Sequence, residues 1–451
     1  MLNRFLIIVM GMLLRYDKRH FEISQTDYIF FFLVIIYLGS AMLLTRNSLE
    51  ALGGTDLVSV TGKLFMVVFG IYVFYKHNYK FSSAMPWAVV FILAIWALLQ
   101  FLKYQTLSVY PMVRFMNLFF AVIIIKVYGL KIVYLFENVV GKLALISLIG
   151  WGLTLLIPNV MLELASLSPF EPYGLVQNGS FFVFGISDSI EVLRRNLGFA
   201  WEPGRFGSIL SVGLFFNLIA NDFRIRRNKN FWYIVGAILS TQSTTAYVTL
   251  MLVIAFYLYN KRRSMFIKLM PLVAVLFVLI IQVDFVGDKI QSLWLTDEHS
   301  YDWQKQLDYF YTQDIVVVPQ RFDGLFYELL NILHDPVIGN ASDEEAYLYS
   351  LFGIRFSLSN GCLRIFANMG IFIGFLYYVY LYRSSKLLSV IFKYRGKIFW
   401  LVLFVMINIS YSWVFEPVFL AFVFYPLYYK RNKALYYDFN KKTTEVLSAC
   451  R

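Results

Sequence analysis

The chain has 451 residues, of which 59% are apolar, 19% are aromatic and only 15% are charged. This composition excludes an ordinary water-soluble domain, in which about a quarter of the residues carry a charge. The formal net charge of +12 is that of many nucleic-acid-binding proteins, so the positions of the cations decide what it means.

Apolar stretches recur along the whole chain. The first apolar stretch, residues 5–14, is followed by basic residues rather than by a cleavage site, and we interpret it as a short interfacial or partly inserted helix. Later runs have helical character and approach the roughly 20 residues that cross a bilayer. They include residues 29–44, 64–75, 86–102 and 371–382. The sequence therefore predicts an all-α polytopic membrane protein.

Two apolar segments have basic residues at both ends, which predicts that each enters the membrane and returns to the same side. Segment 231–259 has a polar middle at Ser240-Thr241-Gln242-Ser243-Thr244-Thr245. The middle of segment 399–429 carries Asn408, Ser410, Ser412, Glu416 and Pro417. Each segment is shorter than two ideal spans, which need about 40 residues. We expect two short hairpins whose polar turns point to the external side.

Lys and Arg residues collect in cytoplasmic loops close to the ends of membrane helices. With the N-terminus inside, the predicted cytoplasmic segments hold about 28 of the 40 Lys and Arg residues. The basic character is therefore a topology signal rather than a nucleic-acid site. This threading predicts about twelve membrane-embedded helices, two cytoplasmic termini and a large external loop after the ninth helix.

The predicted topology divides the chain into six parts. They are N-terminal membrane helices at 1–158, a first long external segment at 159–204, central membrane helices at 205–283, a large and partly helical external loop at 284–360, C-terminal membrane helices at 361–429, and a cytoplasmic tail at 430–451. The large loop is rich in acidic and aromatic residues. Such residues suit sugar rings and protein packing equally well.

A dense group of charges lies where an apolar helix is predicted to begin. Pro203 at the first helical position and Glu202 before it are typical of a helix start. Arg195 and Arg205 beside the positive end of that helix predict an anion-binding site. The alternative is that Glu202 caps the helix and the arginines reach lipid headgroups.

Three further residues are candidates for a functional site. Arg321 precedes an amphipathic stretch that ends in His334-Asp335-Pro336-Val337-Ile338-Gly339, although an ordinary loop arginine has the same context. Asn360 precedes Gly361 and either binds a sugar hydroxyl or forms a turn. Glu416 lies inside a predicted membrane hairpin, where a carboxylate is costly unless it is paired. It either pairs with an external arginine or acts as a base.

The sequence contains no pattern that predicts a metal or a cofactor. No nucleotide-binding glycine loop and no paired acidic motif for a metal–pyrophosphate are present, so a nucleotide-sugar donor is not expected. The four histidines, His20, His77, His299 and His334, lie in separate segments. The two cysteines, Cys362 and Cys450, provide neither a disulfide framework nor a thiolate site.

The order of these motifs resembles the O-antigen polymerase and ligase family. The resemblance rests on Arg195-x-x-Gly198-Phe199 with Glu202-Pro203, the Ser/Thr-rich turn, Arg321 with Asp335-Pro336-x-x-Gly339, and Ser359-Asn360 before a helix containing Gly370 and Gly374. It covers nearly the whole topology and implies a glycosyltransferase C-like fold. Ligases of the family carry a His where this chain has Ser359, a difference that favours the polymerase branch and leaves the catalytic base unidentified.

The resemblance implies an enzyme of the bacterial inner membrane that polymerises oligosaccharide repeat units carried on undecaprenyl pyrophosphate, by metal-independent inverting transfer. Glu202, Arg321 and Glu416 are then the catalytic candidates, and Arg195, Arg205 and Asn360 the candidates for binding the pyrophosphate or sugar. The partners implied are the lipid-linked donor and acceptor and a chain-length regulator protein. An O-antigen ligase and a lipid-linked oligosaccharide flippase are the alternatives.

Overall fold

The structure is a computed structural model that describes residues 23–39, 57–80, 85–105, 110–166, 180–181, 184–186, 195–261, 263–264, 316–317, 321–340, 344–352, 355–356, 358 and 360–431. The predicted interfacial helix at 5–14, residues 265–283 at the end of the predicted central membrane helices, and nearly all of the tail lie outside these residues. The described part is all-α apart from two pairs of two-residue strands. β1 (Ser180–Phe181) pairs antiparallel with β2 (Phe184–Gly185), and β3 (Val316–Val317) pairs parallel with β4 (Arg355–Phe356).

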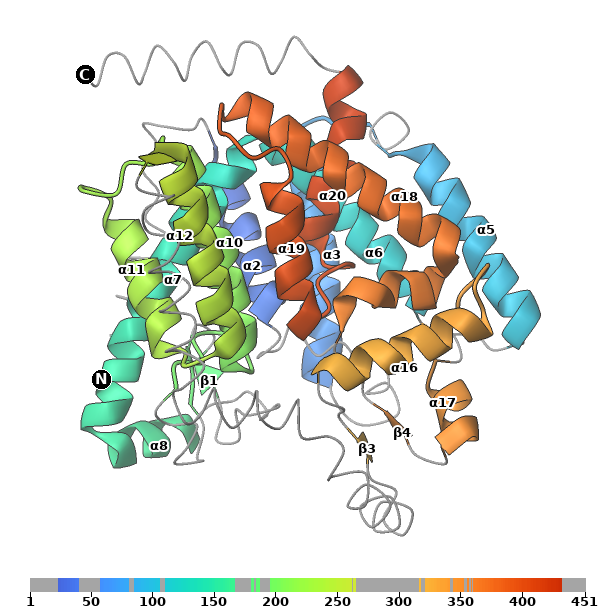
Figure 1. The fold of residues 1–451 in the computed structure, drawn as a ribbon, viewed down its shortest axis with the longest axis horizontal. Coiled ribbons are helices and arrows are strands. Elements are labelled where there is room, and N and C mark those ends of the chain that lie inside the picture. Colours follow the sequence, from blue (N-terminus) through green and yellow to red (C-terminus); the bar gives the residue numbers. More distant parts are fainter. Residues whose placement is uncertain are drawn as a thin grey trace.

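The helices follow one another along the chain with mostly short connections (Figure 1). They are α2 (Gln25–Gly39), α3 (Leu57–Lys76), α5 (Trp87–Tyr104), α6 (Tyr110–Ile123), the π-helical turn η2 (Ile124–Tyr128), α7 (Lys131–Leu156), α8 (Pro158–Ser166), α10 (Pro203–Ala220), α11 (Lys229–Ser240), α12 (Thr244–Lys261), α16 (Arg321–His334), α17 (Glu344–Phe352), α18 (Gly361–Ile391), α19 (Phe399–Ser410) and α20 (Pro417–Arg431).

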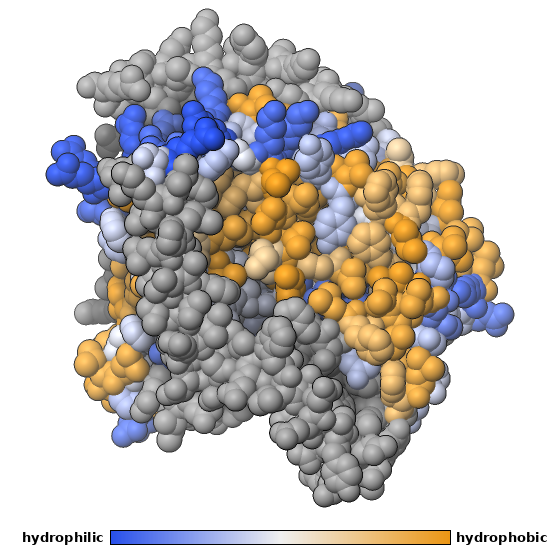
Figure 2. Space-filling model, viewed as in Figure 1, coloured by the Kyte–Doolittle hydropathy of each residue, from blue (hydrophilic) through white to orange (hydrophobic). Residues whose placement is uncertain are grey.

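Four of the described helices, α5, α7, α10 and α18, are long and apolar enough to cross a membrane. Large apolar side chains on α3, α5 and α18 are exposed, among them Leu64, Phe91 and Phe372. Figure 2 shows this apolar surface as a broad orange area below a band of hydrophilic residues. Because so much apolar surface is unfavourable in water, it is consistent with contact to lipid. The predicted all-α class is confirmed, and four of the described helices could span a membrane.

Helix α10 is the central helix of the described part. Residues 203–219 of this helix are all buried, and it packs mainly against α7, α11 and α12. Its serines do not leave polar atoms without partners, since Ser208 and Ser211 donate to the carbonyl oxygens of Gly204 and Gly207 one turn earlier. Only the first turn of α10 carries a charged side chain, and that turn forms part of the site described below.

Both predicted hairpins are present as helix pairs. Helices α11 and α12 are joined by residues 241–243, and α19 and α20 by residues 411–416. The two turns lie together, because Thr245 Oγ1 and Ser410 Oγ are 2.5 Å apart. The charge pattern therefore predicted the turning points correctly, and the polar residues at the two turns meet at one end of the helix bundle.

Helix α18 is interrupted at Gly370, which has φ 82° and ψ 163°. The turn at residues 335–340, which follows α16, fits into this interruption. The amide of Ile371 donates to the carbonyl oxygen of Pro336 and the amide of Asn340 donates to that of Ala367, each at 2.8 Å. The backbone groups freed by the bend are thus satisfied by another segment. Figure 1 shows the resulting sharp bend of α18 above α16.

Helix α5 holds the 335–340 turn from the other side. Gln100 Nε2 donates to the carbonyl oxygens of Ile338 and Gly339, and Trp96 Nε1 also donates to that of Ile338. Tyr104 Oη and Lys103 Nζ both lie 2.7 Å from Asp335 Oδ2. The motif Asp335-Pro336-x-x-Gly339 therefore has an architectural role, in which it joins α5, α16 and α18.

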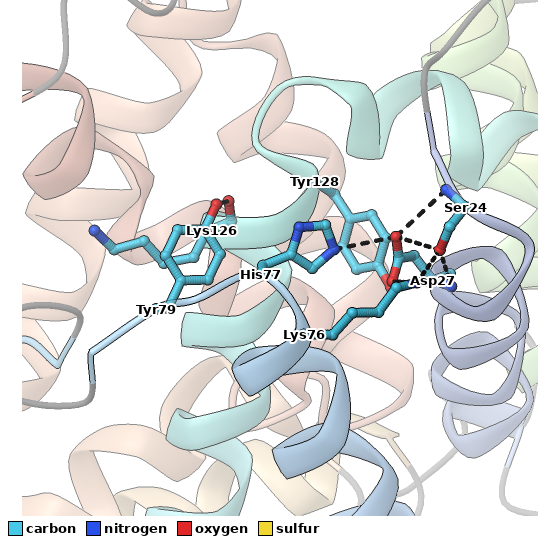
Figure 3. A network of polar contacts seen from close by, with 7 residues as sticks. All are labelled: Ser24, Asp27, Lys76, His77, Tyr79, Lys126 and Tyr128. Carbon is cyan, nitrogen blue, oxygen red and sulfur yellow. Dashed lines mark hydrogen bonds and ion pairs between the residues drawn. The ribbon is translucent and has the colours of Figure 1, made fainter.

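A second polar network ties α2 to α3 (Figure 3). Ser24 and Asp27 cap the start of α2 reciprocally, because the Asp27 amide donates to Ser24 Oγ and the Ser24 amide donates to Asp27 Oδ2 at 3.3 Å. Asp27 also pairs with Lys76 at 3.2 Å and lies 3.1 Å from His77. The Tyr128 hydroxyl donates to the Asp27 carbonyl oxygen at 2.6 Å. This network anchors the C-terminal end of α3 to the start of α2.

Candidate functional site

A buried ion pair joins the start of α10 to the start of α20. Arg205 Nη2 lies 3.1 Å from Glu416 Oε1, and both side chains are buried. The indole ring of Trp413 covers the guanidinium, with Arg205 Cζ 4.3 Å from the ring centroid. Two buried charges are stable only if they are paired. Of the two alternatives for Glu416, pairing with an arginine is therefore the one that the structure contains, and a role as a base stays a prediction.

Glu416 retains unused hydrogen-bonding capacity. Its second carboxylate oxygen, Oε2, is buried and has no hydrogen-bond partner among the described residues. Arg114 of α6 is close enough to act on this carboxylate electrostatically, and its Cζ lies 3.5 Å from the centroid of the Phe415 ring. Arg114 was not predicted, although a cation inside the apolar run 110–123 is a signal of function in a membrane protein.

The turn 411–416 is irregular backbone that side chains from three helices hold in place. Asn117 of α6 donates to the carbonyl oxygen of Phe415 at 3.0 Å, and Tyr377 of α18 donates to that of Val414 at 2.9 Å. The amide of Trp413 donates to Asn408 Oδ1 of α19 at 2.8 Å. Irregular backbone at membrane depth is tolerated when protein groups satisfy it in this way. The position of Glu416 is consequently fixed.

Arg195 is placed by the turn between α11 and α12. Its Nε donates to the carbonyl oxygen of Thr241 at 3.2 Å, and the amide of Asn196 donates to that of Ser240 at 2.9 Å. Burial lowers the pKa of the Arg195 guanidinium, whereas the nearby Tyr411 and Glu202 act in the opposite direction. Arg195, Glu202 and Tyr411 therefore belong to one neighbourhood.

Glu202 occupies the position before α10, with an extended backbone, and Pro203 is the first helical residue as predicted. The Glu202 carboxylate makes no capping hydrogen bond to the helix, so the alternative in which this side chain caps α10 is wrong. The side chain is half-buried. Tyr411 lies beside the same helix start, because a Cβ on Gly204 would overlap its hydroxyl oxygen. The absence of a side chain at Gly204 admits the Tyr411 ring.

Asn360 has a structural position in the described conformation. Its Oδ1 accepts from the amides of Cys362 and Leu363 at the start of α18, and its Nδ2 donates to the carbonyl oxygen of Ile409 at 3.2 Å. The residue is fully buried. The amide therefore holds α18 against the end of α19, and direct contact with a sugar stays a prediction.

Arg321 is the first residue of α16, and its side chain lies outside the described residues. Arg194 and Ser359 lie entirely outside the described residues. The structure thus brings together Arg195, Glu202, Arg205 and Glu416 through the turns of the two hairpins. It adds Arg114, Tyr411 and Trp413 to them. Whether Arg321 reaches this group stays a prediction.

Fold and site together define a class of protein. It is an all-α chain whose apolar helices are consistent with a multi-pass membrane protein, and whose buried charges gather where α10 begins and α19 turns into α20. No protein-family model matches the chain, and no curated protein matches it. The resemblance to a polymerase family therefore depends on the residues quoted from the sequence.

Proposed function

We propose that the protein polymerises oligosaccharide repeat units carried on undecaprenyl pyrophosphate at the external face of the bacterial inner membrane. The observation that carries the proposal is the buried Arg205–Glu416 pair at the N-terminus of α10, with Arg114 and Arg195 nearby. Guanidinium groups beside the positive end of a helix suit a pyrophosphate. The polymer is an O-antigen or a related surface polysaccharide.

The proposed topology has about twelve membrane-embedded helices in a glycosyltransferase C-like arrangement, with both termini in the cytoplasm. It is supported by the position of basic residues at the helix ends remote from the site, such as Lys76, Lys229 and Lys261. These ends are cytoplasmic by the charge rule. The turn that carries Glu416 and the 241–243 turn that accepts a hydrogen bond from Arg195 are at the opposite ends of the hairpins, which corresponds to the external face.

In the proposed reaction, a hydroxyl oxygen of the acceptor sugar forms a bond to the anomeric carbon of the donor chain. The bond from that carbon to the pyrophosphate oxygen breaks, and its electron pair leaves with the lipid pyrophosphate. Arg195, Arg205 and Arg321 stabilise the negative charge of the leaving group without a metal. Attack on the face opposite the leaving group inverts the anomeric configuration.

The proton of the attacking hydroxyl passes to a carboxylate in this proposal. Glu202 and Glu416 are the two candidates. Glu416 Oε1 accepts a hydrogen bond from Arg205 Nη2, whereas Glu416 Oε2 has no hydrogen-bond partner among the described residues. Glu202 is half-buried and its carboxylate is not used as a helix cap. Glu416 is suited to orient the hydroxyl through Oε2, and Glu202 stays the candidate that accepts its proton.

Replacing Arg195 or Arg321 with alanine tests this function in cells that depend on the protein for surface polysaccharide. We expect a fall in polymerisation of roughly 100-fold or more, because each change removes a group that stabilises the leaving pyrophosphate. The polysaccharide on a gel should shrink to single repeats while the amount of membrane-inserted protein stays normal.

The exposed loop residue Arg226 provides the matched control, and Arg226→Ala should leave the chain lengths unchanged. Normal ladders in both Arg195→Ala and Arg321→Ala would refute the proposal. Long polymer that is no longer attached to the lipid A core would instead identify a ligase.

A further inference from the structure

The polarity of α16 is the reverse of that of a helix on a water-soluble domain. Its inward face carries Glu328, Asn331 and the following Asp335, which are 0%, 0% and 4% exposed. Its outward face carries Phe326, Leu329 and Leu333, which are 57%, 45% and 68% exposed. Both sets are spaced at i, i+3 and i+7, so each forms one stripe along the helix. The apolar stripe has no protein cover among the described residues.

The apolar stripe continues into the surface of the spanning helices. Val337, in the turn after α16, is 77% exposed, and the backbone of this turn is bonded to Ile371 of α18. Ile371 and Phe372 are themselves exposed apolar residues on a spanning helix. Figure 2 shows apolar surface extending over this region of the molecule. The surroundings that contact the exposed surface of the spanning helices therefore also contact the stripe.

The depth of the turn agrees with this continuity. The hydroxyl of Tyr104, at the end of α5, donates a hydrogen bond to the Asp335 carboxylate. Trp96 lies about 12 Å before Tyr104 along the same helix, and its indole NH donates to the carbonyl oxygen of Ile338. The C-terminal end of α16 thus lies beside the end of a spanning helix, and the following turn reaches into its apolar length. Figure 1 shows α16 lying across the general direction of α10, α12, α19 and α20.

We propose that α16 lies in the outer interface of the membrane, with the stripe Phe326, Leu329, Leu333 and Val337 in contact with the acyl chains of the lipid. An amphipathic helix at an interface buries its apolar face in the lipid and turns its polar face away from it. Here the polar face is buried in the protein, where Asn331 accepts a hydrogen bond from Asn340 and Asp335 pairs with Lys103 of α5. The segment predicted as a polar external loop thus contains a membrane-seated helix.

With α16 in the membrane interface, the backbone of Arg321 lies at the boundary between lipid and water, because Arg321 is the first residue of α16. On the proposed function, the pyrophosphate of a lipid-linked substrate lies at the same level, since its lipid is embedded in the same leaflet. The membrane seat itself does not rest on the proposed enzyme activity. It depends on the exposed apolar stripe and on the continuity of this stripe with the surface of the spanning helices.

Spin labels test the seat in the full chain reconstituted into liposomes of phosphatidylethanolamine and phosphatidylglycerol. Labels at Leu329→Cys and Leu333→Cys, in a Cys362→Ser, Cys450→Ser background, are relaxed by dioxygen, which concentrates in lipid, or by a nickel chelate, which stays in water. We expect dioxygen accessibility several-fold above nickel accessibility, as for a label at the exposed Phe91 of α5. A label at the exposed Arg395 between α18 and α19 should show the opposite order.

Labels at Leu329 and Leu333 that behave like the one at Arg395 would overturn the proposal. So would labels screened from both reagents, because a protein partner would then cover the stripe. If the cysteine replacements prevent folding, the wild-type chain is treated with lipids that carry a photoreactive group on the acyl chain. Crosslinks within residues 326–337 support this position of α16, and crosslinks confined to α5 and α18 contradict it.

Discussion

Replacing Gly370 with alanine is expected to prevent α18 from folding around the 335–340 turn. Gly370 has φ 82° and ψ 163°, a combination that only glycine adopts readily. A Cβ there would also overlap the carbonyl oxygen of Val337, which belongs to backbone and has little freedom to move. We expect a loss of more than about 4 kcal/mol in the free energy of unfolding, at the upper end of single substitutions.

Gly152 of α7 offers the matched control, because a Cβ at this helical glycine meets nothing within 4 Å. Gly152→Ala should keep or slightly raise the stability, since alanine favours a helix over glycine by about 1 kcal/mol. Thermal unfolding in detergent measures both variants. A Gly370→Ala protein that melts with the wild type would show that the 335–340 turn does not lock α18.

The second large effect is expected at the buried pair of Arg205 and Glu416. Arg205→Gln should lower the free energy of unfolding by about 3 to 5 kcal/mol, because it leaves the Glu416 carboxylate buried without its cation. Replacing both residues, as Arg205→Met with Glu416→Leu, removes both charges at similar volume. Such an exchange is often neutral for stability. The double variant should therefore unfold near the wild-type temperature.

The polymerase activity of the double variant then shows whether the Arg205–Glu416 pair only stabilises the fold or also takes part in the reaction. If the pair only stabilises the fold, the double variant polymerises normally. On our account it is folded and inactive, because the pyrophosphate has lost Arg205 and the hydroxyl has lost Glu416. Chain length on gels, compared at equal amounts of folded protein, measures this. Exposed Arg383 on α18 supplies the control, and Arg383→Met should retain full activity.

The positions of charges in the sequence predicted much of the fold. Basic residues on both sides of segments 231–259 and 399–429 predicted that these segments double back, and both do so at their polar residues. The cost of a carboxylate at membrane depth predicted that Glu416 has a cationic partner. Both predictions follow from the poor solvation of charge in lipid, which makes the positions of a few polar residues highly informative.

Other features depend on contacts between distant segments and had no local signal. The bend at Gly370 is completed by a turn some thirty residues earlier in the chain, and α5 holds that turn in place. The capping role of Asn360 became visible only once α18 and α19 were adjacent. The inverted polarity of α16 also required the structure, because periodicity shows two faces of a helix and not which one is buried.

The most direct measurement of the central claim uses the purified protein in liposomes that contain lipid-linked repeat units and no nucleotide sugar. Our account predicts a ladder of longer lipid-linked chains, with one molecule of undecaprenyl pyrophosphate released for each repeat added, and no ladder with Arg205→Gln. Transfer of the repeats across the bilayer without elongation would contradict the account and indicate a flippase.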